Sequence, residues 1–223
     1  IIAYQNEASS NVFKGISIVG TVSGTSISFG TSVTFEIAPS NWVSATLDST
    51  NNKVVIAYAD GGNSYYGTSI VGTVSGTSIS FGTATVFESA NATYVSASYD
   101  STNQKTVIAY QDGGNSDYGT AIVGTVSGTS ISFGTAVVFA AASTNYNSAT
   151  FDSTNNKTVI AYRGTSNYGT AIVGTVSGTS ISFGTAVVFA AASTNESQAT
   201  FNSTNGKIII AYKDNGTAEG RTI

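Results

Sequence analysis

Short runs of β-branched and aromatic residues alternate with small polar residues along the whole chain, and this pattern returns at a nearly fixed interval. The string Ile-Ala-Tyr recurs at steps of 54, 52, 52 and 50 residues, ending at Tyr4, Tyr58, Tyr110, Tyr162 and Tyr212. A longer string, VGTVSGTSISFGT, recurs unchanged at 19–31, 71–83, 123–135 and 173–185. Self-similarity of this kind predicts a tandem array of one unit of about 52 residues.

One unit contains four β-rich runs that are separated by turn residues. In the second copy these runs, named a to d in chain order, are 95–99, 105–110, 120–126 and 130–139. The turn Ser127-Gly128 between c and d suits a tight hairpin, because glycine accepts a positive φ. No window has the apolar spacing of a helix, and short turns join antiparallel neighbours. Each unit is therefore predicted to be a four-stranded antiparallel meander.

A four-stranded meander repeated in tandem is typical of the blades of a β-propeller. The predicted fold is an all-β propeller, formed by a single repeat-built domain over 1–223. A β-solenoid is the second choice and a two-sheet sandwich the third. Five Ile-Ala-Tyr strands favour five blades, whereas closure by strand exchange would give four. The predicted repeats are 1–41, 42–93, 94–145, 146–195 and 196–223.

The chain contains no Met and starts and ends inside a repeat, so it is interpreted as a piece of a longer array. Charged residues make up 9% and hydrophobic residues 41%, a mixture that suits stiff β-structure with polar, uncharged surfaces. The absence of His and Cys excludes disulfides, catalytic triads built on either residue and the usual zinc sites. No apolar run approaches the ~20 residues of a membrane helix. We therefore expect no metal, no cofactor and no membrane insertion.

The copies differ from one another in two kinds of connection. All variation in length lies between runs b and c, in the loops 5–15, 59–67, 111–119 and 163–169. The connections from run d to the next run a keep their length but change their residues, at 36–43, 88–95, 140–147 and 190–197. In an antiparallel meander both kinds of connection emerge at the same end. One end of the array is thus predicted to be varied and the other uniform, and binding usually resides in loops held by a rigid scaffold.

Aromatic side chains are concentrated at the predicted varied end. The candidate binding residues are six rings and two carboxylates, namely Trp42, Tyr66, Tyr94, Tyr118, Tyr146, Tyr168, Asp60 and Asp112. The rings occupy two registers of the repeat, which hold Glu196 and Lys14 respectively in the copy that lacks a ring. Flat aromatic faces beside Asn, Asp and Ser favour a sugar-binding surface. The alternative is that the rings pack beneath the loops as small satellite cores.

Charge and spacing argue against several other functions. The varied end, counted with both chain ends, carries four basic and nine acidic residues, so it repels phosphate and we expect no nucleic acid partner. Asp48, Asp100 and Asp152 lie in one register, but each precedes an Asn-rich turn and is predicted to cap it instead of serving a glycosidase. Asp60-Gly-Gly-Asn63 lacks the alternating ligand spacing of an established calcium site.

The block IVGTVSGTSISFGT followed by SATFDSTNNKTVIAY resembles repeats of phage tail-fibre and microbial surface proteins over essentially the whole chain. The resemblance implies an extracellular, virion or cell-surface location and a structural or receptor-binding role, and it transfers no catalytic residue. The predicted function is a non-catalytic module whose varied end contacts a glycan or protein receptor. The alternatives are a structural scaffold that joins neighbouring subunits and, less favoured, a glycosidase-like enzyme.

Overall fold

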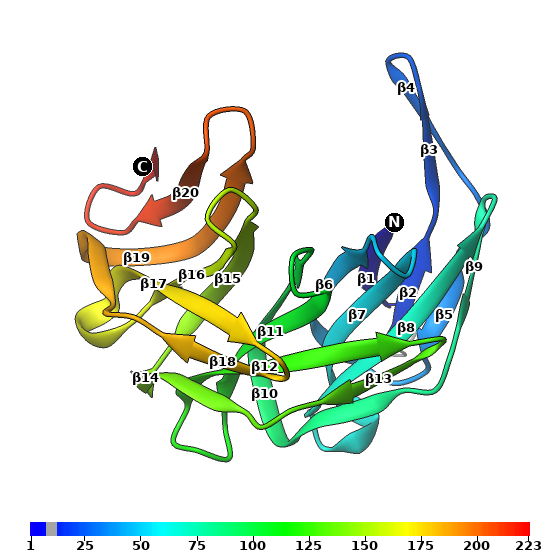
Figure 1. The fold of residues 1–223 in the computed structure, drawn as a ribbon, viewed down its shortest axis with the longest axis horizontal. Helices are drawn as coiled ribbons and strands as arrows, with labels where there is room; N and C mark the ends of the chain where they lie inside the picture. Colours follow the sequence, from blue (N-terminus) through cyan, green and yellow to red (C-terminus); the bar gives the residue numbers. More distant parts are fainter. Residues whose placement is uncertain (8–12) are drawn as a thin grey trace.

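The computed structural model describes residues 1–7 and 13–223, and it is an all-β structure. Two short 3-10 turns, Gly61–Asn63 and Thr165–Asn167, interrupt the strands. Among the described residues, no helix is long and apolar enough to cross a membrane. In Figure 1 the repeated units follow one another along an arc, with β1 (Ile2–Glu7) on one arm and β20 (Lys207–Asp214) on the other.

The strands group into five consecutive units, each built from the predicted runs. The first unit contains β2 (Phe13–Ile18), β3 (Gly20–Ser23), β4 (Ser26–Phe29) and β5 (Val33–Glu36) after β1. The second contains β6 (Ser40–Asp48), β7 (Lys53–Asp60), β8 (Tyr66–Ser75), β9 (Ser78–Phe81) and the first half of β10 (Thr85–Asp100). The third contains the rest of β10, β11 (Lys105–Asp112), β12 (Tyr118–Ser127), β13 (Ser130–Phe133) and β14 (Val137–Ser143).

The last two units repeat the same order. The fourth contains β15 (Asn145–Asp152), β16 (Lys157–Arg163), β17 (Tyr168–Ser177), β18 (Ser180–Phe183) and the first half of β19 (Val187–Asn202). The fifth contains the rest of β19, β20 and β21 (Glu219–Thr222). Every pairing between described strands is antiparallel, as the meander predicts, which argues against the parallel solenoid.

Run d differs from its prediction as one strand over 130–139. It forms two strands, β13 and β14, which pair with the two halves of β12. The break lies at Gly134, where a Cβ would collide with the carbonyl oxygen of Thr179 in the next unit. The neighbouring unit therefore occupies the space beside the strand at this point, although the same break follows Phe183, where no later hairpin reaches Gly184.

The connections from run d to the next run a were predicted to be loops, and this is wrong at two of the four positions. Residues 88–95 lie inside β10, and 190–197 lie inside β19, each a continuous strand of 16 residues. The register of β10 shifts between Thr93 and Ser96, and a shift of this kind bends a strand. One bent strand thus closes one unit and opens the next.

Hydrophobic cores lie between the units. One core combines Val107 and Val123 of the third unit with Ile160 and Ile172 of the fourth. Strand β11 faces such a core on both sides, which is why its residues are buried almost without alternation. The a strands of successive units also meet directly, because the Ala97 amide donates a hydrogen bond of 2.9 Å to the Ser44 hydroxyl.

The hairpin between runs c and d packs back onto the preceding unit. In the third unit its residues Val126 and Ile131 are 7% and 4% exposed and contact the second unit. In the first unit the equivalent Val22 and Ile27 are 72% and 53% exposed. Figure 1 shows this hairpin, β3–β4, projecting beyond its neighbours.

Candidate functional site

The varied connections do meet at one end of the array. The Gly61 amide in a b–c loop donates to the carbonyl of Pro39 in the adjacent d–a connection at 2.7 Å. In the next unit Gly113 donates in the same way to Asn91 at 2.8 Å. These bonds hold the two kinds of connection side by side, as the sequence predicts. The central part of the predicted loop 5–15, residues 8–12, lies outside the described residues.

Three rings from successive units stack in a row, which we call the aromatic ladder (Trp42, Tyr94 and Tyr146). The ring centroids of Trp42 and Tyr94 are 4.2 Å apart, and those of Tyr94 and Tyr146 are 5.1 Å apart. The guanidinium carbon of Arg163 lies 5.0 Å from the centroid of Tyr146 and so continues the row. All three rings and Glu196 line one pocket of about 210 Å³. The structure thus brings together the first of the two predicted registers.

Each ladder residue stands at a bulge in its strand. Trp42, Tyr94, Tyr146 and Glu196 have φ angles of 55°, 50°, 52° and 54°. This left-handed region is unusual for bulky residues and costs about 1 to 3 kcal/mol. A bulge re-aims a side chain relative to the regular pleat. The backbone therefore holds all four side chains out of the alternating pattern at the same point of the repeat.

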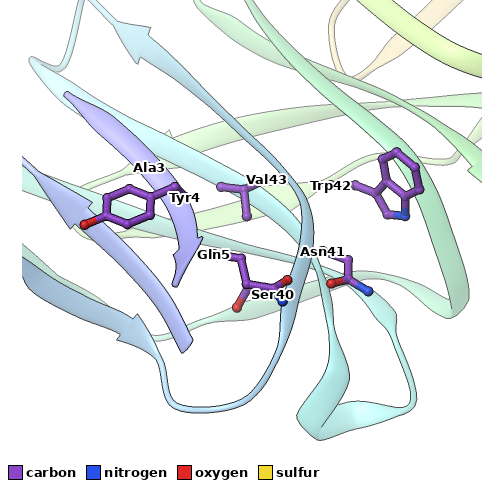
Figure 2. Close-up of a pocket in the computed structure, with 7 residues that line it drawn as sticks. All are labelled: Ala3, Tyr4, Gln5, Ser40, Asn41, Trp42 and Val43. Atoms are coloured by element: carbon purple, nitrogen blue, oxygen red, sulfur yellow. The ribbon is translucent and has the colours of Figure 1, made fainter. Parts of the chain in front are cut away.

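The ladder is neither a free surface nor a closed core. Trp42 is 43% exposed, while Tyr94 and Tyr146 are half-buried because they cover one another. Beyond Trp42 lies a second pocket of about 490 Å³, whose lining includes Ser40 and Tyr4. Figure 2 shows the Trp42 indole pointing away from the Tyr4 ring, so this pocket lies beside the ladder and not beneath it.

The residue after each ladder position becomes more polar along the row. It is Val43 and Val95 in the first two cases, then Asn147 and Ser197. The Asn147 amide and the Ser197 hydroxyl are buried and have no hydrogen-bond partner among residues 1–7 and 13–223. Both residues line the ladder pocket. The ladder pocket, which we also call the groove, therefore has an apolar end and an end with unsatisfied polar groups.

Arg163 is a functional candidate that sequence reasoning missed. Its Nη1 donates to Asn195 Oδ1 at 2.6 Å and its Nη2 to Asn145 Oδ1 at 2.8 Å. The side chain thereby ties two successive connections together behind the stack of rings. The signal was the change from Gln111 in the third unit to Arg163 in the fourth, because these two positions are equivalent in the repeat.

The second predicted register does not join the ladder. Tyr66, Tyr118 and Tyr168 are the first residues of their strands and lie directly after the b–c loops. Tyr66 pairs in register with Asp60, and Tyr118 with Asp112. These rings form separate, partly exposed positions at the edge of the varied end.

Asp60 and Asp112 act as turn caps. Asp60 Oδ1 accepts from the Gly62 amide at 2.8 Å, and Asp112 Oδ1 accepts from the Gly114 amide at 2.9 Å. Burial and the neighbouring Glu36 raise the pKa of Asp60. In the described parts of the chain, no group of three or more acidic side chains is arranged to hold a metal ion.

The aspartates at the uniform end cap their turns as predicted. Asp100 accepts from the amides of Thr102 and Asn103 at 3.0 and 2.9 Å, and from the Asn103 side chain at 2.8 Å. Asp152 makes the same set of bonds, and the hydrogen bond from the Asn155 side chain lowers its pKa. These carboxylates are occupied by the turns that they hold.

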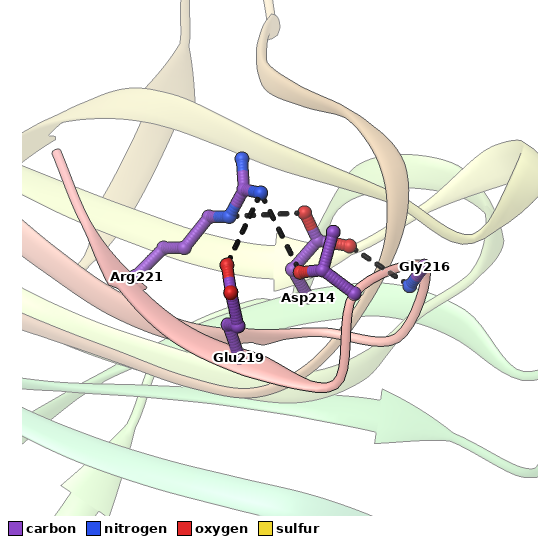
Figure 3. A network of polar contacts seen from close by, with 5 residues as sticks. Asp214, Gly216, Glu219 and Arg221 are labelled. Carbon is purple, nitrogen blue, oxygen red and sulfur yellow. Dashed lines mark hydrogen bonds and ion pairs between the residues drawn. The ribbon is translucent and has the colours of Figure 1, made fainter.

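A polar network at the last hairpin lies at the far end of the ladder. Arg221 Nε is 3.2 Å from Asp214 Oδ2, and Asp214 also accepts from the Gly216 amide (Figure 3). Arg221 and Glu196 line the same pocket of about 390 Å³. Arg221 is largely exposed, so this ion pair contributes little stability, and its importance here is that it places a cation near the polar end of the groove.

Comparison with known proteins gives no relative from which to transfer a role. Neither a protein-family model nor a curated protein matches the chain. The functional argument therefore depends on the ladder and its surroundings.

Proposed function

We propose that this protein is a non-catalytic binding module that holds a glycan along the aromatic ladder. The observation that carries the proposal is the row of three partly exposed rings, each on a backbone with positive φ, beside the exposed side chains of Glu196 and Gln198. The apolar faces of a sugar pack against rings, and its hydroxyls are suited to bond the exposed polar side chains of Glu196 and Gln198, which line the same pocket.

The proposal includes a finer fold and a location. We infer that the units are blades of a β-propeller, on the grounds of their antiparallel meanders, the direct contacts between a strands and the cores between units. An extracellular, virion or cell-surface location fits the low content of charged residues and the resemblance to tail-fibre repeats. Here the ladder would face a glycan on a host or partner cell.

The test is a glycan array probed with the wild type and with a double variant, Tyr94→Ala with Tyr146→Ala. A matched control is Tyr66→Ala with Tyr118→Ala, which removes two rings of the same type from the second register. We expect saturable binding that the ladder variant loses and the control keeps, with circular dichroism unchanged in both. Equal binding by all three proteins, or no glycan bound at high concentration, would contradict a glycan site at the ladder. Binding of a surface protein but no glycan would favour the protein receptor.

A second candidate function, assembly with neighbouring subunits, is favoured by one observation. The β3–β4 hairpin exposes Val22, Ile27 and Phe29, although the equivalent hairpins of later units are buried against their neighbours. Light scattering of the wild type and of a Val22→Lys, Ile27→Lys variant distinguishes the two functions. Concentration-dependent association that only the wild type shows would support assembly, and a wild type that stays monomeric at millimolar concentration would count against it.

A further inference from the structure

The first three of the four junctions between units differ in how a buried tyrosine is paired. At the first, the Tyr58 hydroxyl donates to Glu36 Oε2 of the preceding unit at 3.3 Å. At the second, Tyr110 donates to Glu88 Oε2 at 3.0 Å. Both tyrosines are fully buried, so each carboxylate satisfies a hydroxyl that water cannot reach.

At the third junction the carboxylate is missing. Tyr162 is equivalent to Tyr110, and its ring lies 5.2 Å from Phe139, the same distance as between Phe87 and Tyr110. The position of Glu88 is taken by Ala140. Tyr162 is 3% exposed, and its hydroxyl makes no hydrogen bond to any described residue. The Tyr162 hydroxyl is thus held in the same place as in its two counterparts, without the carboxylate acceptor.

Two further changes open a pocket at this point. From Asp112 to Tyr118 the third unit has six residue steps, whereas Gly164 to Tyr168 in the fourth has four, so the loop is two residues shorter. In the third unit the longer loop packs Gly114 closely against Ala90. In the fourth unit this cover is absent, and a pocket of about 430 Å³ remains. Its lining includes Phe139, Ala140, Ala142, Tyr162, Gly164 and Val188.

The lining defines the chemistry of an occupant. The wall combines apolar groups, namely alanine methyl groups, Val188 and the Phe139 ring, with hydroxyl donors, of which Tyr162 is one; the others are those of Thr165, Ser166, Tyr168 and Thr170. The two carboxylates of the preceding junction, Glu88 and Asp112, are replaced here by Ala140 and Gly164. A negatively charged ligand would therefore meet none of the repulsion that those groups would cause. The equivalent glutamates show that a carboxylate on a short aliphatic stem fits beside this hydroxyl.

We propose that the pocket between the third and fourth units binds a small organic acid, with its carboxylate accepting the hydrogen bond of Tyr162 and its aliphatic body against Ala140, Ala142 and Val188. The ligand takes the place of the glutamate side chain that the first two junctions carry. This site is separate from the aromatic ladder and does not depend on the glycan proposal. The small contact area sets the expected dissociation constant on the order of millimolar.

The experiment follows the alanine methyl signals of the labelled protein by NMR during titration with acetate, propionate, butyrate and 3-methylbutyrate. 1-Butanol, which has the stem of butyrate and no carboxylate, is the matched ligand. We expect saturable shifts at Ala140 and Ala142 that grow from acetate to butyrate and are about tenfold weaker in affinity for the alcohol, as loss of a charge-assisted hydrogen bond predicts.

Two variants identify the contacts. Tyr162→Phe removes the donor and should weaken butyrate about tenfold and butanol much less, because the alcohol accepts only a neutral hydrogen bond. Ala140→Glu restores the side chain of the other junctions and should abolish binding of butyrate. Tyr110→Phe, the same change at the second junction, should leave butyrate binding unaltered.

The proposal is overturned by any of three results. The first is that no signal shifts at a butyrate concentration 100-fold above a millimolar dissociation constant. The second is equal affinity for butyrate and butanol. The third is equal butyrate affinity in Tyr162→Phe and wild type. If Ala140→Glu does not fold, the comparison of Tyr162→Phe with wild type still decides the matter.

Discussion

The two ends of each unit are built on the same strands but differ in how their sequences are fixed. At the uniform end the hairpin tip of one unit reaches back to the unit before it, so that a Cβ at Gly82 would collide with the Thr129 carbonyl and one at Gly134 with the Thr179 carbonyl. At the varied end each b–c loop contacts the connection beside it, as Gly113 does with Asn91.

This difference indicates which contacts keep the sequence of the repeat the same from one unit to the next. A change at the uniform end disturbs two units at once, because the tip of the next hairpin must still fit. A change at the varied end alters one junction and leaves the rest of the array intact. The shortened loop 163–169 is an example, since it opens a pocket at one junction while the strands on either side keep their register.

The largest effect is expected from breaking the contact between units at Gly82. Gly82→Ala forces a methyl group against the Thr129 carbonyl, and overpacking of this kind should cost about 2 to 3 kcal/mol of unfolding free energy. Gly184→Ala is the matched control, because no next hairpin reaches that glycine and a Cβ there meets only the Val173 carbonyl oxygen, at an ordinary contact distance of 3.8 Å. Urea unfolding measures both. Equal losses in the two variants would show that the glycine is required by its own backbone and not by the neighbouring unit.

A smaller effect should separate the turn caps of the two ends. Asp100 accepts three hydrogen bonds at the uniform end, so Asp100→Ala should cost about 1 to 2 kcal/mol. Asp112 accepts from the Gly114 amide at the varied end and lies near Glu88, so Asp112→Ala should cost about 0.5 kcal/mol or less. The same unfolding measurement compares them, and a larger loss for Asp112→Ala would contradict the expectation that the cap at the uniform end contributes more to stability.

The strain at the ladder provides a third comparison. Tyr94→Ala and Tyr94→Gly both remove the ring, but glycine adopts the φ of 50° without the clash that a Cβ suffers. The glycine variant should therefore be the more stable of the two by about 1 kcal/mol, a reversal of the usual order within a strand. Thermal unfolding of the pair measures this difference. If alanine were instead the more stable, the positive φ would carry no strain.

The sequence was sufficient for the strands but not for their contacts across units. Runs a, b and c were located because hydrophobic alternation and turn residues are local signals. The close approach of the Thr179 carbonyl to Gly134 was not predictable, because Thr179 belongs to the next unit. The long strand β10 was also missed, since a bulge leaves no mark in the pattern apart from a change of register.

The candidate site shows the same limit. A shared register indicated that Trp42, Tyr94 and Tyr146 are equivalent, but stacking depends on the distance between units, which the repeat length does not reveal. Arg163 was overlooked for that reason as well. Asp60 and Asp112 were assigned to binding although an Asp-Gly-Gly sequence is itself turn chemistry, and the structure shows both as caps.

The smallest effect concerns the glutamate carboxylate beside the buried tyrosine, which the first two junctions between units carry and the third lacks. Burial and the nearby Asp112 raise the pKa of Glu88, so the folded protein binds a proton there more readily than the unfolded chain does. The contribution of Glu88 to stability is therefore greatest below the unfolded pKa and is lost as pH rises through the folded one. Glu88→Gln keeps an acceptor for Tyr110 and removes the charge.

Glu88→Gln should consequently raise stability at pH 7 by less than about 1 kcal/mol, because the site is partly exposed, and should flatten the change of stability between pH 4 and 7. Urea unfolding at four pH values measures the slope, and Ala140→Gln is the control at the junction that carries no carboxylate. A steeper slope in Glu88→Gln than in wild type would mean that the tyrosine requires the charged acceptor. In that case the tyrosines at the first two junctions would require a charged glutamate as acceptor. The pocket beside Tyr162 would then bind the carboxylate form of its ligand in preference to the acid form.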